Sequence, residues 1–211
     1  MAAIINQISP SVFDNTDSLN NLRANLIRSG LNNLNWPKNK SAKIVVLGLT
    51  GAGKTTLIEF MQKGAVENSQ KRRPTLAFSF HQCDFGKLKA IFVDVPGQEA
   101  YWSNWKSYMK GADGVIFVID STKLSDIAKA YAVYLKTMKS SENVPVAILA
   151  NKQDIRGSLS SDSILSMMSI YNDSKIVKSF DTIALTGKGI FPALLWLLEV
   201  AKEKFNVSVA N

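Results

Sequence analysis

The chain has 211 residues, of which 46% are hydrophobic and 20% are charged, enough for one globular domain with a single core and a short appendage. The formal net charge of +8 is compatible with an anionic partner, but no nucleic-acid recognition motif accompanies it, so we expect no nucleic-acid binding. A single cysteine excludes an intramolecular disulfide, and a single histidine argues against a zinc-type ligand cluster.

We expect residues 1–40 to form an N-terminal extension and residues 41–211 to form the domain. Ser18 can cap an amphipathic helix that Gly30 ends or bends. Its apolar stripe and the residues that continue it are Leu19, Leu22, Leu26, Leu31, Leu34 and Trp36. Two interpretations stay open: reversible membrane contact through residues 1–36, or packing of this stripe on the domain or on a partner.

The N-terminus lacks the pattern of a signal peptide, and no apolar run reaches the length of about 18 residues that a membrane span needs. Position 2 is Ala2, which excludes N-myristoylation, and the C-terminus carries no prenylation motif. We therefore expect a cytoplasmic protein, either free or peripheral on the cytosolic face of a membrane.

The segment from Gly48 to Thr55 reads Gly-Leu-Thr-Gly-Ala-Gly-Lys-Thr, the spacing of a phosphate-binding P-loop. A buried-strand pattern at residues 43–47 precedes it, and a helical pattern starts at Thr56, as the motif requires. We expect Lys54 near the β- and γ-phosphates and the Thr55 hydroxyl on Mg²⁺. The predicted phosphate-binding residues are Gly48, Thr50, Gly51, Ala52, Gly53, Lys54, Thr55 and Thr56.

A second candidate site follows residues 90–93, which form another buried-strand pattern. Asp94 can hold the Mg²⁺ shell through water, and the Gly97 N–H can donate to the γ-phosphate. Gln98 is the candidate for orienting the attacking water, so we expect the catalytic residues to be Gln98 and Lys54. Upstream, Thr75 is the candidate for a second hydroxyl on Mg²⁺, available only while the γ-phosphate keeps its loop closed. The predicted metal ligands are therefore Thr55, Thr75 and Asp94.

The run Asn151-Lys152-Gln153-Asp154 follows a strand pattern at residues 144–150, so it lies at the carboxyl end of a strand, where open α/β sheets bind ligands. The Asp154 carboxylate can accept from both N1–H and the 2-amino group of guanine. Adenine offers neither donor there and would leave the carboxylate unpaired. Asn151 and Lys152 would brace the loop and cover the base. The sequence therefore predicts GTP and GDP as ligands and disfavours ATP.

Strand and helix patterns alternate along the chain, which is typical of βαβ units. We predict an α/β fold of the P-loop nucleotide-hydrolase class, with a mostly parallel sheet of six strands flanked by helices. A hairpin of residues 76–84 and 88–95 supplies its antiparallel strand. Further strands are expected over 114–120 and 180–185, and helices over 98–110, 125–140, 164–170 (capped by Asp162) and 191–205.

In this order the motifs resemble those of Ras-superfamily small GTPases, and most closely the ADP-ribosylation-factor branch, over roughly residues 41–205. The resemblance rests on the Asn-Lys-Gln-Asp loop, Lys54-Thr55-Thr56-Leu57, Phe78 after Thr75, and Trp105 and Tyr108 after Gln98. It implies a molecular switch that slowly hydrolyses GTP to GDP and phosphate with Mg²⁺. It also implies effector, GAP and exchange-factor partners, a monomeric core, and a role in membrane-associated trafficking or membrane organisation. It also implies that Ala184 gives its N–H to guanine O6, with Leu185 beside it.

The chain departs from that branch at Pro96, Val93 and Thr50, where the family has glycine, tryptophan and aspartate. The resemblance implies an interswitch hairpin that slides by two residues when GTP binds and expels an N-terminal helix. Pro96 fixes φ and removes an N–H, which restricts such a movement. Val93 removes one ring of a surface aromatic triad, so effector recognition is expected to differ.

A second function stays open beside the hydrolytic switch: an interaction module that keeps GTP bound and scarcely hydrolyses it, as in the β-subunit of the signal-recognition-particle receptor. The presence of Gln98 favours the hydrolytic switch, whereas Pro96 and Thr50 are compatible with the GTP-bound interaction module. Arg72 stands three residues before Thr75, where heterotrimeric Gα subunits carry a catalytic arginine. We prefer to interpret it as part of a solvated basic run, residues 71–73.

Overall fold

The computed structural model describes residues 30–31, 34–66, 74–139, 144–170 and 176–208. Its centre is a six-stranded sheet in the order β2-β3-β1-β4-β5-β6, in which β2 is antiparallel to β3 and all other neighbouring pairs are parallel. The predicted α/β fold is confirmed. The strands are β1 (Ala42–Leu47), β2 (Ser79–Phe85), β3 (Leu88–Asp94), β4 (Gly114–Asp120), β5 (Val146–Asn151) and β6 (Val177–Thr182).

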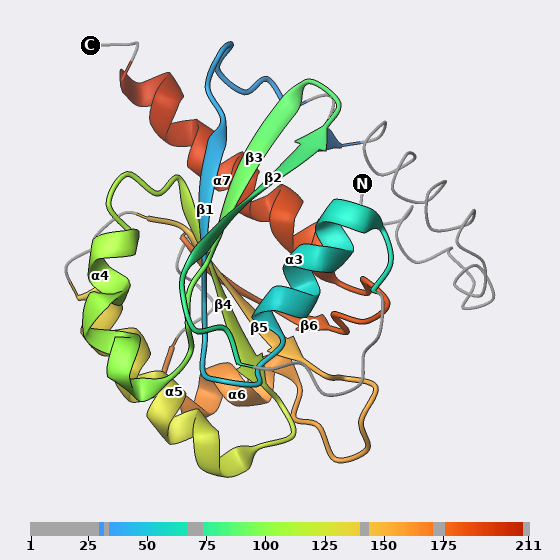
Figure 1. The fold of residues 1–211 in the computed structure, drawn as a ribbon, viewed down its shortest axis with the longest axis vertical. Helices are drawn as coiled ribbons and strands as arrows, with labels where there is room; N and C mark the ends of the chain where they lie inside the picture. The colour runs from blue at the N-terminus through green and yellow to red at the C-terminus, as the bar shows by residue number, and fades with distance from the viewer. Residues whose placement is uncertain (1–29, 32–33, 67–73, 140–143, 171–175, 209–211) are drawn as a thin grey trace.

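Helices cover both faces of this sheet (Figure 1). On one face lie α3 (Lys54–Lys63) and α7 (Ile190–Ser208), which share one apolar cluster. On the other face lie α4 (Trp105–Tyr108), α5 (Leu124–Met138) and α6 (Ser161–Met167), which share a second cluster. The 3₁₀ helix η3 (Glu99–Asn104) leads into α4.

Alternation along β1 explains why two layers of helices are needed. Ala42, Ile44 and Val46 belong to the cluster under α3 and α7, whereas Val45 and Leu47 belong to the cluster under α4 to α6. Successive strand side chains point to opposite faces, and here both sets are apolar. A central strand of this kind is stable only when both faces are covered, as in parallel sheets of α/β proteins.

The last residues of the predicted extension belong to the core. Leu31 is 2% exposed and Trp36 is 8% exposed, and both pack in the cluster under α3 and α7. Gly30 lies against Leu195 of α7, where a Cβ would come within 2.9 Å of that side chain. Leu31 and Trp36 are therefore buried in protein, so the apolar stripe predicted over residues 1–36 is not continuous on the surface. The helix predicted from Ser18 lies outside the described residues.

Several predicted boundaries were wrong. The strand predicted from residue 76 begins at Ser79, and the helix predicted over 164–170 spans Ser161–Met167. The helix predicted over 98–110 consists of η3 followed by the single-turn α4. The last strand begins and ends three residues earlier than predicted, so Ala184 and Leu185 lie in the loop that follows β6. The N-cap of α6 is Ser160 and not Asp162, because the Ser160 hydroxyl accepts a hydrogen bond from the Ser163 N–H.

The buried face of α5 is set by the sheet on which it packs. Leu135 follows Ile127 and Tyr131 at helical spacing but is 47% exposed. The side chains that face the sheet are Ile127, Ala130, Val133, Tyr134 and Thr137. Tertiary packing selects this face, and the Thr137 hydroxyl donates to the Val133 carbonyl within the helix, which removes the cost of burying it.

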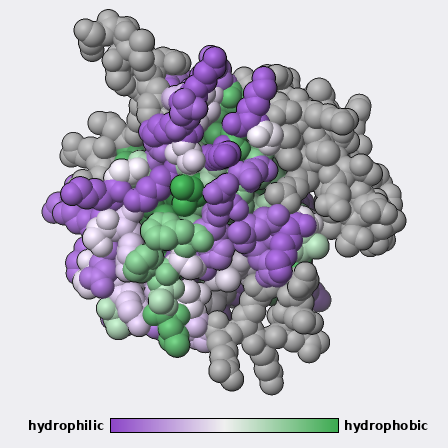
Figure 2. Space-filling model, turned by 45° about the horizontal axis from the view of Figure 1, so that its top comes forward, coloured by the Kyte–Doolittle hydropathy of each residue, from purple (hydrophilic) through white to green (hydrophobic). Residues whose placement is uncertain are grey.

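Hydrophilic side chains dominate the described surface in the view of Figure 2, with hydrophobic ones exposed in a band between them. The large hydrophobic residues that remain exposed include Leu76, Phe78 and Phe80, in and just before β2. Among the described helices, none has the length and the apolar run needed to cross a bilayer.

Replacing Trp36 by alanine tests the docking of the extension on the core. We expect Trp36→Ala to lower the free energy of unfolding by about 3–5 kcal/mol, because a large buried ring is removed. Leu124→Ala, at a position that is 60% exposed, is the control and is expected to change it by less than about 0.5 kcal/mol. Urea unfolding of the GDP-loaded proteins measures both. Equal, small effects would contradict the burial of Trp36.

Candidate functional site

The carboxyl ends of β1, β3, β5 and β6 lie at one edge of the sheet, and the loops that leave them line a cavity of about 390 Å³. Thirteen of the sequence-predicted site residues line it: Thr50, Gly51, Gly53, Lys54, Thr55, Thr56, Thr75, Gly97, Asn151, Lys152, Asp154, Ala184 and Leu185. Pro74 and Ile155 line it as well, although the sequence analysis did not select them. The motifs, spread from residue 50 to residue 185 of the sequence, thus form one site.

The other predicted residues lie just behind the cavity wall. The Gly48 carbonyl accepts a hydrogen bond from Lys54, and the Ala52 carbonyl accepts one from Asn151. Asp94 is buried at the end of β3. Gln98 has extended backbone (φ −72°, ψ 147°) and directly precedes η3, next to the cavity-lining Gly97.

Lys54 is the buried cation of the site. Its Nζ donates to the carbonyl oxygens of Gly48 at 2.8 Å and Leu49 at 3.1 Å, so the P-loop backbone holds it in place. Burial lowers the pKa of Lys54 to about 8, and the charge of Asp94 opposes this shift. A phosphate in the cavity would relieve the cost of burial by supplying negative charge.

Three side-chain oxygens gather beside Lys54. The Thr55 hydroxyl donates to Asp94 Oδ2 at 2.6 Å and lies 3.1 Å from the Thr75 hydroxyl. Asp94 Oδ1 is buried without a hydrogen-bond partner, which is costly unless a further group binds there. Hydroxyl and carboxylate oxygens are the ligand type that Mg²⁺ prefers. The three residues therefore fit a magnesium ion.

Two glycines allow the loops around the cavity to approach each other closely. A Cβ on Gly97 would lie 2.5 Å from Lys54 Nζ and 2.6 Å from the Gly48 carbonyl oxygen, so the backbone after β3 touches the P-loop only because Gly97 has no side chain. Gly53 has φ +103°, and a Cβ there would lie 2.3 Å from Asn151 Nδ2. Any side chain at these positions would push the loops apart.

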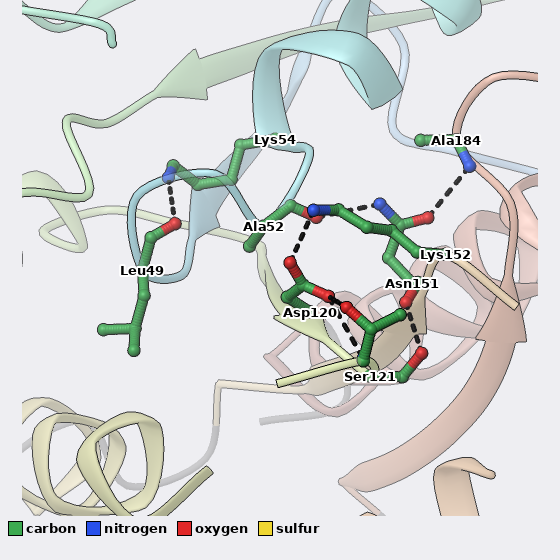
Figure 3. Close-up of polar contacts among 9 residues, drawn as sticks. Leu49, Ala52, Lys54, Asp120, Ser121, Asn151, Lys152 and Ala184 are labelled. Carbon is green, nitrogen blue, oxygen red and sulfur yellow. Dashed lines mark hydrogen bonds and ion pairs between the residues drawn. The ribbon is translucent and has the colours of Figure 1, made fainter. Parts of the chain in front are cut away.

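Asn151 joins the loops at the opposite end of the cavity (Figure 3). Its Nδ2 donates to the Ala52 carbonyl at 2.8 Å, and its Oδ1 accepts from the Ala184 N–H at 2.9 Å. The Ser121 hydroxyl donates to the Asn151 backbone carbonyl at 2.6 Å. The Ala184 N–H, predicted to bind a base, is thus engaged by Asn151 and must change acceptor to reach guanine O6.

A sequence model of the ADP-ribosylation factor family matches residues 28–201. ADP-ribosylation factor-like protein 1 of Saccharomyces cerevisiae is 34% identical over 176 residues, which cover 80% of this chain and 92% of the yeast protein. Human ADP-ribosylation factor-related protein 1 is 35% identical over 168 residues, with 74% and 83% covered. The chain belongs to the ADP-ribosylation factor family of small GTPases.

Members of this family bind guanine nucleotide and hydrolyse GTP. The fold agrees with the assignment: the Arl6 (BBS3) small GTPase of Trypanosoma brucei, solved with the nucleotide analogue GppNp, superposes with a TM-score of 0.69 at 22% identity. The aligned part covers 78% of this chain and 99% of that structure. The resemblance inferred from the motifs is confirmed.

Asp120 is a residue of this small GTPase that the sequence analysis missed. It ends β4, beside Asn151 at the end of β5, and its carboxylate accepts a hydrogen bond from Lys152 Nζ (Figure 3). It also accepts one from the Thr122 hydroxyl at 2.6 Å. Burial would raise the pKa of Asp120, but the bonds from Lys152 and Thr122 and the charge of Lys152 lower it overall. The available signal was an aspartate that closes an apolar strand at the edge where Asn151 also lies.

The ion pair between Asp120 and Lys152 offsets the unfavourable backbone conformation of Lys152, whose φ of 71° is in the left-handed region. It ties Lys152, which lines the cavity, to the carboxyl end of β4. The pair therefore orders the loop that is predicted to recognise guanine.

We expect Asp120→Asn to weaken GDP binding by about tenfold, because a charge-assisted hydrogen bond that orders Lys152 is lost. Titration with a fluorescent GDP analogue measures the dissociation constant. Asp113→Asn is the matched control: it breaks the ion pair between Asp113 and Lys40, which lies before β4, at the opposite end of that strand. An equal loss of affinity in both variants would mean that the effect is a general loss of stability.

Proposed function

We propose that this small GTPase is a nucleotide-dependent switch that senses the γ-phosphate through the loops that carry Thr75 and Gly97. The observation that supports this most strongly is their convergence. Thr75 reaches the Thr55–Asp94 cluster, and Gly97 lies against Lys54, so both loops meet the end of the cavity where a γ-phosphate would bind. Loss of that phosphate would remove the group that both loops contact.

In the proposed reaction, water attacks the γ-phosphorus and the bond to the β-phosphate oxygen breaks, which gives GDP and phosphate. Gln98 orients the water, while Lys54 and the P-loop amides bind the phosphate oxygens on which charge develops. Thr55 and Thr75 would hold Mg²⁺ directly and Asp94 through water. The bound ion would supply positive charge to the β- and γ-phosphates. These groups act by position and electrostatics and need no covalent intermediate.

At the other end, Asp154 would accept from N1–H and the 2-amino group of guanine, and the stem of Lys152 would cover the base. Asp154 lies at the surface of the cavity, so a base that binds there removes it from water. That burial is favourable only with a ligand that donates to both carboxylate oxygens. Leu185 and Ile155, 43% and 46% exposed, offer apolar contact to the same base.

Effector proteins would recognise the nucleotide state at the outer surface beside these two loops. Phe78, three residues after Thr75, packs on Tyr108 of α4 with ring centroids 5.1 Å apart, and edge-on against Phe80 at 5.6 Å. Phe78 and Phe80 are 46% and 63% exposed. Movement of either loop would change this aromatic surface, which supports it as the place where effectors distinguish GTP from GDP.

Single-turnover hydrolysis of preloaded GTP with Mg²⁺ tests the proposal. We expect slow turnover of the parent protein, reduced about a hundredfold by Gln98→Leu, which removes the water-orienting amide. Gln62→Leu in α3, which is not a cavity residue, is the control. The nucleotide that co-purifies with each protein is recorded by chromatography.

If the parent protein and Gln98→Leu both retain GTP unhydrolysed, the switch is rejected in favour of the GTP-bound interaction module. Turnover that is insensitive to Gln98→Leu would instead reject the role of Gln98 while leaving the enzyme in place.

We further propose that membrane contact, as part of a trafficking role, is carried by residues before Gly30. Leu31 and Trp36 are buried, so they are excluded as lipid contacts in this conformation. The sequence before them still carries leucines at helical spacing together with Arg23 and Arg28. Those residues lie outside the described part of the chain.

Co-sedimentation with anionic vesicles tests this contact on the full chain. We expect Leu22→Ser with Leu26→Ser to reduce the pelleted fraction severalfold, because each change removes apolar area worth about 1.5–3 kcal/mol of burial. The GTP hydrolysis rate should stay unchanged. Equal pelleting of the two proteins would reject membrane contact through this segment.

A further inference from the structure

Two tryptophan indoles hold two consecutive carbonyl groups in the loop after β3. Trp105 Nε1 donates to the Pro96 carbonyl at 3.0 Å, and Trp102 Nε1 donates to the Gly97 carbonyl at 3.1 Å. The two rings also pack on each other, with centroids 6.3 Å apart. Trp105 is fully buried and packs against Phe117 of β4, so the pair is anchored in the core.

These two hydrogen bonds fix more than the carbonyl groups. In a planar trans peptide, the C=O of one residue and the N–H of the next point in opposite directions. Both peptide bonds here are trans. Trp105, through Pro96, therefore sets the direction of the Gly97 N–H, and Trp102, through Gly97, sets the direction of the Gln98 N–H and the start of Gln98.

Other contacts leave this loop little freedom. The Pro96 ring fixes φ at that residue. On the far side, Gly97 is in contact with Lys54 and the P-loop, with no room for a Cβ. Gln98 is also the N-cap residue of η3, the short helix that contains Trp102. The Trp102 indole thus bonds back to the residue before Gln98. This hydrogen bond closes a small loop, made of the backbone from Gly97 to Trp102 and the Trp102 side chain, that includes Gln98.

We propose that Trp102 is a positioning residue for GTP hydrolysis: its hydrogen bond to the Gly97 carbonyl keeps the Gly97–Gln98 peptide in the orientation that directs Gln98 to the attacking water. This inference rests on the proposed role of Gln98. Trp105 shares in the arrangement, but its complete burial makes it part of the fold as well. Trp102 is half-buried, so its donor can be removed with less effect on packing.

The test is Trp102→Phe, which keeps an aromatic ring against Trp105 and removes only the donor and part of the ring. A neutral hydrogen bond contributes about 0.5–1.5 kcal/mol, so we expect single-turnover GTP hydrolysis to slow by about three- to tenfold. GDP dissociation is expected to stay unchanged, because GDP lacks the phosphate that this loop faces. The thermal midpoint should shift by no more than about 2–4 °C.

The matched control is Trp196→Phe, which removes an indole from α7, where Trp196 packs on Phe180 on the other side of the sheet. We expect it to leave hydrolysis and GDP dissociation unchanged. An unchanged hydrolysis rate in Trp102→Phe would overturn the inference. Slower hydrolysis together with faster GDP dissociation would also overturn it, since general loosening of the site would then explain both.

Gln98→Leu in the same assay separates this inference from the proposed function. A parent rate that depends on Gln98 but not on the Trp102 donor rejects only the role of Trp102. A parent rate that does not depend on Gln98 rejects the proposed role of Gln98, and the role of Trp102 with it, whereas GTP that stays unhydrolysed in the parent protein rejects the proposed switch.

Discussion

The site depends on the hydrogen bonds of the Asn151 side-chain amide. Its Nδ2 donates to the Ala52 carbonyl of the P-loop, and its Oδ1 accepts from the Ala184 N–H in the loop after β6. Its own backbone carbonyl is held by Ser121 at the end of β4. Three connections that leave three strands are thereby fixed relative to one another. Each bond is buried, so the loss of any one would leave a polar group without a partner.

The same amide explains a requirement of the P-loop. Gly53 faces Asn151 Nδ2 so closely that any Cβ would displace it. The glycine is needed there for contact between loops and for its left-handed φ, in addition to its part in surrounding phosphates. The glycine of the phosphate motif and the asparagine of the predicted base-recognition motif therefore depend on each other, because they are in direct contact.

The two loops at the phosphate end of the site are held by different contacts. A hydroxyl contact of 3.1 Å with Thr55 links Thr75 to the metal-ligand cluster. The loop of Pro96 and Gly97 is held by a proline ring, two indole donors and the P-loop itself. Nucleotide-dependent movement is therefore expected to be larger around Thr75 than around Gly97.

The sequence by itself determined the ligand class, the order of strands and helices, and most of the residues around the cavity, because these depend on motifs that are local in the chain and on patterns of period 2 and 3.6. Tertiary structure alone decided the Asp120–Lys152 pair, the burial of Trp36, the face of α5 that packs on the sheet and the Ser160 cap. Each of these depends on which segments distant in sequence become neighbours. An aspartate after a strand or a leucine on a helix does not carry that information until the sheet has brought its partner within contact distance.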